Sequence, residues 1–170
     1  MSNGDVSQGR RRFLIGATSV VGGVGVVGAA VPFVASWNPS AKAEAAGAPV
    51  TVNVSKLEPG QQMTVKWRGK PVWVIRRTEE MNENILELND QVKDPLSKEA
   101  DQPAYIEGEL RALKDEYAVL VGICTHLGCS PQFRPEVAPA DLGENWLGGF
   151  YCACHGSRYD LAGRVYPNMP

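Results

Sequence analysis

The chain divides into three stretches that differ in how hydrophobic and polar residues follow one another. Residues 13–37 are apolar or small throughout, and no charged side chain interrupts them. A helix of this length reaches roughly 37 Å at about 1.5 Å per residue, enough to cross a hydrocarbon core of about 30 Å. Residues 38–49 are rich in Ala, Pro, Gly and Ser and predict a flexible hinge linker, either helical or extended. We therefore expect one transmembrane helix, a linker and a separate head at 50–170.

The head alternates hydrophobic and polar residues over short runs, which is typical of strands rather than helices. Turn residues such as Arg68-Gly69 separate several of the runs. The pattern predicts a mainly-β domain, with one polar, acidic insertion at 78–113 that contains a helix at 79–88. Strands are expected at 50–54, 62–67, 71–75, 117–121 and 148–151, followed by a final hairpin at 159–166.

The residues before the apolar run indicate how the helix is oriented. Residues 10–14 read Arg-Arg-Arg-Phe-Leu and resemble the twin-arginine export signal. Basic residues before a span also follow the positive-inside rule. Both features predict a cytoplasmic segment at 1–12 and a head outside the cytoplasm. A removable signal peptide is the alternative, because residues 41–43 resemble a cleavage site; its apolar region would normally span only about 7–15 residues, so we expect a retained anchor.

Charge and cysteine content narrow the class of protein further. The net charge is −2, and because residues 1–12 sum to +2, the remainder is mildly acidic at −4. This balance lacks the basic footprint of a nucleic-acid-binding protein. All four Cys and both His of the chain fall in two short boxes. The boxes read Cys124-Thr-His126-Leu-Gly-Cys129 and Cys152-Ala-Cys154-His155.

Six such side chains exceed what one metal centre needs. A [2Fe–2S] cluster takes four protein ligands, and two His in place of two Cys raise its potential. Two Cys then remain, one in each box, and they could form a disulfide in an oxidising compartment. A zinc site would use four ligands of the same types but would leave the extra Cys unexplained.

The sequence CTHLGC followed by CACHGSRYD resembles the Rieske signature, in the disulfide-containing form found in bc1-type complexes. This resemblance implies an antiparallel β-sandwich with a small cluster-binding subdomain at about 121–166. Ala153 stands where the family commonly has Pro, a departure that leaves ligation unaffected. The resemblance implies that Cys124 and Cys152 bind the inner iron of a [2Fe–2S] cluster, His126 and His155 bind the outer iron, and Cys129 and Cys154 form a disulfide.

The resemblance also implies roles for residues around the cluster. Ser157 and Tyr159 would donate hydrogen bonds that raise the potential towards the upper part of the Rieske range, roughly +300 mV. Leu127 would shield the cluster and face a quinol pocket. His155 would accept a hydrogen bond and a proton from quinol. We expect Gly128 and Gly156 to permit the tight loops that bring the boxes together.

The implied function is electron transfer within a dimeric ubiquinol–cytochrome c reductase. The head would accept one electron from ubiquinol at the cytochrome b site and move to deliver it to cytochrome c1. The implied location is the bacterial inner membrane, single-pass, with the amino terminus cytoplasmic and the head periplasmic. A Rieske subunit of a periplasmic molybdenum oxidase, such as arsenite oxidase, is the alternative. Family members continue with a proline-containing loop and further strands, whereas the present sequence ends at Pro170; the end has the appearance of a truncation, and the sequence leaves open whether it is one.

Overall fold

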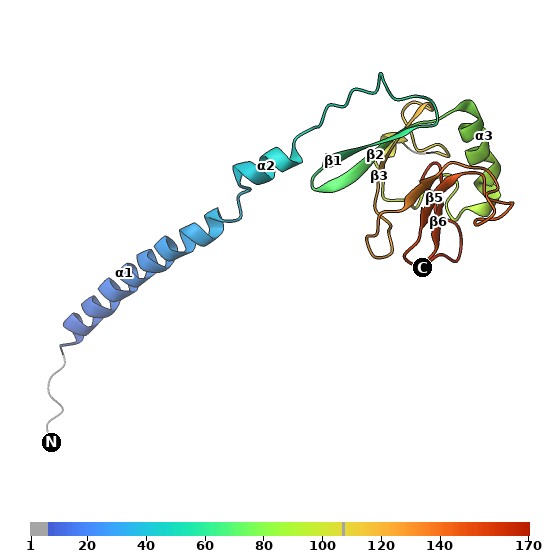
Figure 1. Ribbon diagram of the computed structural model, residues 1–170. Helices are drawn as coiled ribbons and strands as arrows, with labels where there is room; N and C mark the ends of the chain where they lie inside the picture. Colours follow the sequence, from blue (N-terminus) through green and yellow to red (C-terminus); the bar gives the residue numbers. More distant parts are fainter. Residues whose placement is uncertain (1–6, 107) are drawn as a thin grey trace. The chain divides into compact units, whose positions relative to one another are not determined.

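A computed structural model describes residues 7–106 and 108–170 (Figure 1). The chain divides into two compact units, Met1–Ala48 and Pro49–Pro170. The first contains helix α1 (Gln8–Ala35) and the short helix α2 (Ala41–Gly47). Of the two conformations expected for the alanine-rich linker, its central part therefore adopts the helical one.

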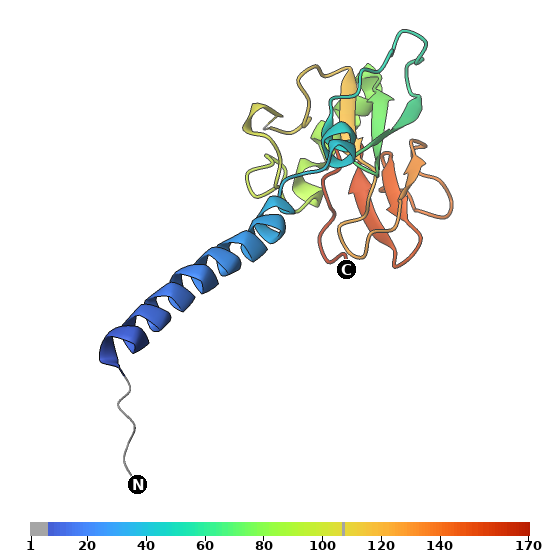
Figure 2. The same ribbon diagram turned by 90° about the vertical axis from the view of Figure 1, so that its left-hand side faces the viewer.

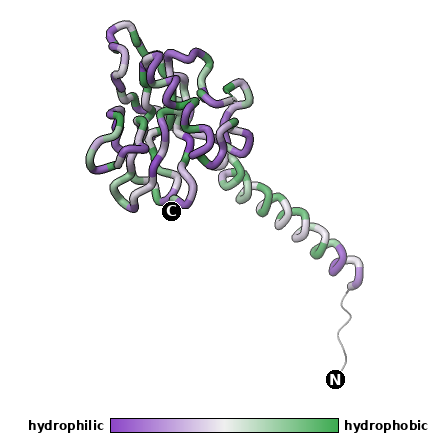
Figure 3. Tube along the Cα trace, turned by 90° about the vertical axis from the view of Figure 1, so that its right-hand side faces the viewer, coloured by the Kyte–Doolittle hydropathy of each residue, from purple (hydrophilic) through white to green (hydrophobic). Residues whose placement is uncertain are grey.

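Helix α1 is long and apolar enough to cross a membrane, by the criteria of length and composition alone. The side chain of Ser7 caps its start by accepting a hydrogen bond from the backbone N–H of Arg10 at 3.4 Å. The helix begins before the apolar run because the arginines ahead of that run are themselves good helix formers. Figure 3 shows a polar first turn followed by a predominantly hydrophobic helix.

The second unit contains two three-stranded antiparallel sheets (Figure 1, Figure 2). This arrangement confirms the expected mainly-β, antiparallel head. The first sheet has the order β1–β2–β3 and the second the order β4–β5–β6. The strands are β1 (Gln62–Trp67), β2 (Lys70–Arg76), β3 (Tyr117–Val121), β4 (Gln132–Arg134), β5 (Gly149–Cys152) and β6 (Ser157–Asp160).

The strand predicted at 50–54 is not formed, the second arm of the hairpin predicted at 159–166 is reduced to an isolated bridge between Tyr159 and Val165, and strand β4 was not predicted. Residues 50–54 belong to no strand, although Val52 and Val54 are partly buried between exposed neighbours. Alternation favours an extended chain, but a strand also needs a hydrogen-bonded neighbour. Strand β4 has three residues, too few to show a period of two in the sequence. Its pairing with β5 creates it.

A shared hydrophobic core joins the two sheets beneath the Cys/His boxes. Trp73 of β2 stacks on Phe150 of β5, with ring centroids 4.8 Å apart. Cys124, Cys152 and Tyr159 belong to the same buried cluster. The Cys residues thus lie where strand packing fixes their positions.

The polar insertion contains helix α3 (Glu79–Glu87) and two short 3-10 helices, η1 (Leu88–Gln91) and η2 (Ala104–Ile106), and its α3–η1 part packs against the residues that follow β6. At the end of β6, Asp160 and Arg164 form a fully buried ion pair, 2.6 Å apart, and Arg164 links this end of the strand to the insertion. Arg164 also donates to Asn89 Oδ1 at 2.6 Å and to the carbonyl oxygen of Ile85. These bonds satisfy a charge that would be costly to bury alone.

Candidate metal centre

The first Cys/His box forms a tight loop between β3 and β4. The backbone N–H of Cys124 donates to the carbonyl oxygen of Cys129 at 2.7 Å. The N–H of Gly128 donates back to the carbonyl oxygen of Cys124 at 3.1 Å. Gly128 has φ 82, a left-handed conformation that favours glycine. The loop therefore folds back on itself.

The second box forms the turn between β5 and β6. Cys152 is the last residue of β5 and pairs with Ser157, the first of β6. The N–H of Gly156 donates to the carbonyl oxygen of Cys152 at 2.9 Å, and Gly156 has φ 79. The strand register thus places Cys152 and Ser157 side by side beneath an exposed turn.

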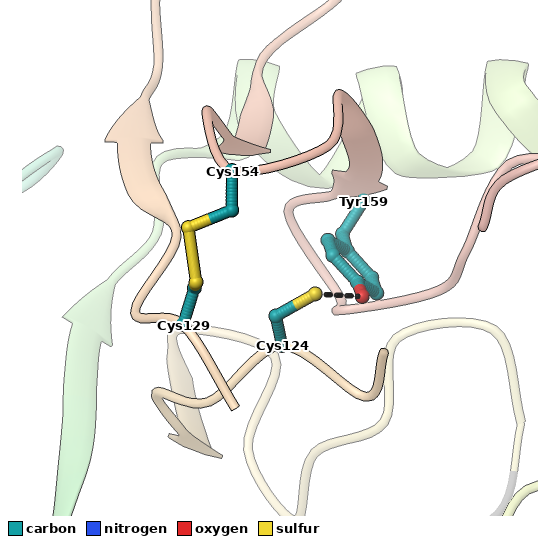
Figure 4. Close-up of a disulfide and its surroundings, with 4 residues drawn as sticks. All are labelled: Cys124, Cys129, Cys154 and Tyr159. Atoms are coloured by element: carbon teal, nitrogen blue, oxygen red, sulfur yellow. Dashed lines mark hydrogen bonds between the residues drawn. A yellow bond between two sulfur atoms is a disulfide. The ribbon is translucent and has the colours of Figure 1, made fainter. Parts of the chain in front are cut away.

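A disulfide between Cys129 and Cys154 joins the two loops (Figure 4). The implied pairing is therefore confirmed. The sulfur atoms of Cys129, Cys152 and Cys154 lie within 4.8 Å of one another. Two of these sulfurs are bonded to each other and are not free thiolates, so this trio is not itself a metal site. The disulfide instead braces the loops beside Cys152.

Cys124 and Cys152 remain as free thiols, with exposed fractions of only 3% and 1%. Burial opposes ionisation of Cys124, but hydrogen bonds from Tyr159 and the backbone outweigh it and lower the pKa of the thiol. The pKa of the Cys152 thiol is raised, chiefly by burial and further by the neighbouring Cys124. The two thiols thus form an interacting buried pair in which the pKa of Cys124 is lowered and the pKa of Cys152 is raised.

The two imidazoles meet on the outer side of the loops. The ring centroids of His126 and His155 are 4.7 Å apart, and the rings are inclined at 77°. His126 is half-buried and His155 is exposed. Within the described part of the chain, the buried Nδ1 atom of His126 has no hydrogen-bond partner. A buried ring nitrogen without a partner is suited to metal ligation.

Two hydroxyl groups approach the buried thiols from β6. The hydroxyl of Tyr159 lies 3.2 Å from Cys124 Sγ (Figure 4). The fully buried Ser157 hydroxyl has no partner of full hydrogen-bond geometry among the residues that the structure describes, although its approach contributes to the lowered pKa of the Cys124 thiol. Both residues that the resemblance singled out thus lie at the sulfur side.

Thr125 was missed by the sequence analysis. Its Oγ1 lies 3.1 Å from the Tyr159 hydroxyl oxygen, and its backbone N–H donates to the same oxygen at 3.3 Å. These contacts hold the phenol towards Cys124. The only indication of this role in the sequence was that Thr125 has a short hydroxyl side chain and lies between two expected ligands. Leu127, two residues further along the same loop, has 71% of its surface exposed.

The residues present fit a mixed-ligand [2Fe–2S] cluster. Two buried free thiols and two neighbouring imidazoles come together from two loops that a disulfide links. The buried His126 Nδ1 and the Ser157 hydroxyl both lack a full partner among the described residues. Thiolate and imidazole are the ligand types of such a cluster, so the donor set matches in kind and number.

Comparison with known protein families agrees with this donor set. Residues 48–170 match the description of the Rieske [2Fe-2S] domain. The chain belongs to the Rieske family. The cofactor of this family is a [2Fe–2S] cluster. Residues 1–40 match a second description, the TAT signal of the ubiquinol–cytochrome c reductase Fe–S subunit.

Curated relatives carry the name of one enzyme complex. The chain is 57% identical to the ubiquinol-cytochrome c reductase iron-sulfur subunit of Allochromatium vinosum, over all of this chain and 82% of the relative. It is 38% identical to the subunit of the same name from Bradyrhizobium diazoefficiens, over 92% of this chain and 80% of the relative. The chain is also 26% identical to a chain of a solved structure, "Hyperthermophilic respiratory Complex III", over 94% of this chain and 91% of that one, with a TM-score of 0.43.

Proposed function

We propose that this Rieske chain is the electron-transfer subunit of a ubiquinol–cytochrome c reductase. It would accept one electron from ubiquinol at a cytochrome b site and deliver it to cytochrome c1. The observation that carries the proposal is the exposed His155 beside two buried thiols, in a chain 57% identical to a subunit of that name. Oxidation of quinol requires a one-electron acceptor together with a group that takes up a proton, and this arrangement can offer both.

Four residues would hold the cluster, which when bound supplies the one-electron acceptor. The buried Cys124 and Cys152 would bind one iron, and His126 and His155 the other. This assignment is supported by the burial of both thiols and by the 4.7 Å separation of the imidazole rings. The disulfide Cys129–Cys154 would keep the two loops at a fixed spacing.

The other side chains divide their roles by position. The ring nitrogen of His155 that does not hold iron would, in its deprotonated form, accept a hydrogen bond from quinol and then its proton, since this imidazole is exposed. Leu127 would cover the centre and contact the quinol pocket. On the sulfur side, the hydroxyls of Ser157 and Tyr159 would donate hydrogen bonds and raise the potential.

The amino-terminal unit would act as a retained membrane anchor. We propose that residues 13–37 span the bacterial inner membrane, with residues 1–12 cytoplasmic and the head periplasmic. The uncharged length of α1 and its preceding arginines support this orientation. Residues 38–49 would be the hinge on which the head, residues 50–170, moves between cytochrome b and cytochrome c1, in a dimeric complex. The cluster-binding subdomain would span about 121–166.

Purification of the complex from membranes tests the proposal. The full chain should co-purify with cytochromes b and c1 and give a rhombic EPR signal from a reduced mixed-ligand [2Fe–2S] cluster. The preparation should oxidise ubiquinol, and His155→Ala should abolish that activity. Co-purification with a molybdenum subunit in place of the cytochromes would overturn the quinol assignment, and bound zinc without iron would overturn the cluster.

A further inference from the structure

The hairpin that joins β1 and β2 ends in a cationic, aromatic tip. We define the basic tip as residues 66–70, Lys-Trp-Arg-Gly-Lys. Trp67 and Lys70 form the last pair of the hairpin, and Arg68 and Gly69 make the turn with φ 49 and 76. Positive φ at both central residues is characteristic of the tight two-residue turn of a twisted hairpin. In Figure 1 this tip projects beyond the other strands of the head.

The charge of the basic tip contrasts with the rest of the head. The tip carries +3, whereas residues 49–170 together carry −4, so the remainder of that unit carries −7. Lys66, Arg68 and Lys70 are all exposed. None of the ion pairs between described residues involves these three side chains. The tip therefore presents an unneutralised positive field on an acidic body.

The tip also combines its charge with an aromatic side chain. The guanidinium carbon of Arg68 lies 4.5 Å from the centroid of the Trp67 ring. This cation–π contact keeps the cation and the ring together at the end of the hairpin. Tryptophan flanked by basic residues is the composition that favours the interface between lipid headgroups and water.

We propose that the basic tip binds the anionic headgroup surface of the membrane in which the chain is anchored. The inference rests on the proposed anchoring of α1. Residues 36–48 join α1 to the head unit and reach at most about 45 Å when fully extended, so a bilayer surface always lies nearby. Anionic headgroups attract the tip and repel the acidic remainder, which orients the head with its hairpin towards the lipid.

Tryptophan quenching tests the proposal on the full chain with its cluster, reconstituted in vesicles. The lipids would be phosphatidylcholine alone or a mixture with phosphatidylglycerol, each brominated near the headgroup. Subtracting the signal of Trp67→Phe isolates Trp67 from the other Trp residues. We expect quenching of Trp67 in the phosphatidylglycerol vesicles and its loss in phosphatidylcholine or at high salt. Removing all three tip cations should lower the ratio of bound to unbound heads by roughly a hundredfold.

Matched variants make the test specific. The triple variant Lys66→Gln/Arg68→Gln/Lys70→Gln should lose the quenching. The control Lys93→Gln/Lys98→Gln/Lys114→Gln removes the same charge from other exposed positions and should retain it. Unchanged cluster EPR intensity would show that both heads are folded.

Each of four results would overturn the proposal. Trp67 quenching that is absent, or equal with and without phosphatidylglycerol, contradicts headgroup binding. Loss of quenching in the control variant as well would show a response to net charge alone. A change in Trp67 fluorescence that requires the cytochrome subunits and does not depend on the lipid composition would assign the tip to an acidic protein surface. Failure of the chain to float with the vesicles would overturn the anchor and the tip together, whereas flotation without quenching overturns the tip alone.

Discussion

The two sides of the candidate metal centre differ in burial and in chemistry. On the sulfur side, Cys124 and Cys152 are almost completely buried, and the Tyr159 hydroxyl lies 3.2 Å from Cys124 Sγ. On the imidazole side, His155 is exposed and Leu127 is 71% exposed. A buried hydrogen bond acts in a low dielectric and tunes the centre, whereas an exposed ring can meet a partner. We infer that the sulfur side sets the potential and the imidazole side makes the functional contacts.

The strands explain why the two sides differ. Cys152 ends β5 and Cys124 lies shortly after β3, so both thiols remain within the packed core. His126 and His155 lie farther along each loop, outside that core. Membership of the packed core, which includes both thiols and neither imidazole, therefore separates the two sides.

The largest expected effect is loss of the cluster when a sulfur ligand is removed. Cys124→Ala should abolish the rhombic EPR signal and the bound iron, because the other free thiol, Cys152, is itself assigned as a ligand and cannot replace it. Ser130→Ala, at a nearby exposed position, is the control and should keep both the EPR signal and the bound iron. A full iron complement in Cys124→Ala would contradict the ligand assignment.

The disulfide variant should show the next largest effect, on stability. Cys129 and Cys154 are 25 residues apart, and closing a loop of that length contributes about 3.5 kcal/mol in the chain-entropy description. Cys129→Ser/Cys154→Ser should lower the free energy of unfolding by about that amount, as measured in urea. We also expect faster loss of the cluster. An unchanged unfolding midpoint would show that the disulfide does not stabilise the head.

Removal of the β6 hydroxyls should lower the potential and leave the cluster assembled. A hydrogen bond to a charged group contributes about 1.5–3 kcal/mol, and a tenfold change in a one-electron equilibrium is about 59 mV. Ser157→Ala and Tyr159→Phe should therefore each lower the potential by tens of millivolts up to roughly 130 mV, measured by redox titration. Tyr151→Phe, on the neighbouring strand, should leave it unchanged. If Tyr151→Phe and Tyr159→Phe gave equal shifts, the sulfur side would not be the site of tuning.

The smallest expected effect lies on the imidazole side. Leu127→Ala removes an exposed apolar side chain next to His126 and should slow quinol oxidation severalfold while leaving the potential unchanged. Val137→Ala, an exposed apolar position in another loop, should change neither quantity. A lowered potential in Leu127→Ala would contradict the inference that the sulfur side alone sets the potential.

The sequence allowed local features of the fold to be predicted, because their signals are contained in short segments. Arg68-Gly69 marked the β1–β2 turn, and the two boxes placed the candidate ligands in two loops. The prediction of a strand at 50–54 was wrong because alternation of hydrophobic and polar residues does not provide a neighbouring strand with which to pair. Strand β4 arises only from its pairing with β5.

Long-range polar contacts were also beyond the reach of the sequence. A charged residue such as Arg164 is expected at the surface, yet here it is fully buried. Its partners include Asn89, which lies in another segment of the chain. The contact between Thr125 and Tyr159 likewise depends on how β6 packs against the first loop.

The nitrogen ligands of the cluster provide the most direct test of the central claim. Pulsed EPR of the reduced full chain, with ¹⁵N-labelled histidine, counts the imidazole nitrogens that couple to the cluster. We predict two distinct couplings, assigned to His126 and His155, in a sample that contains two irons per chain. A cluster with no histidine coupling, or with only one, would contradict the account.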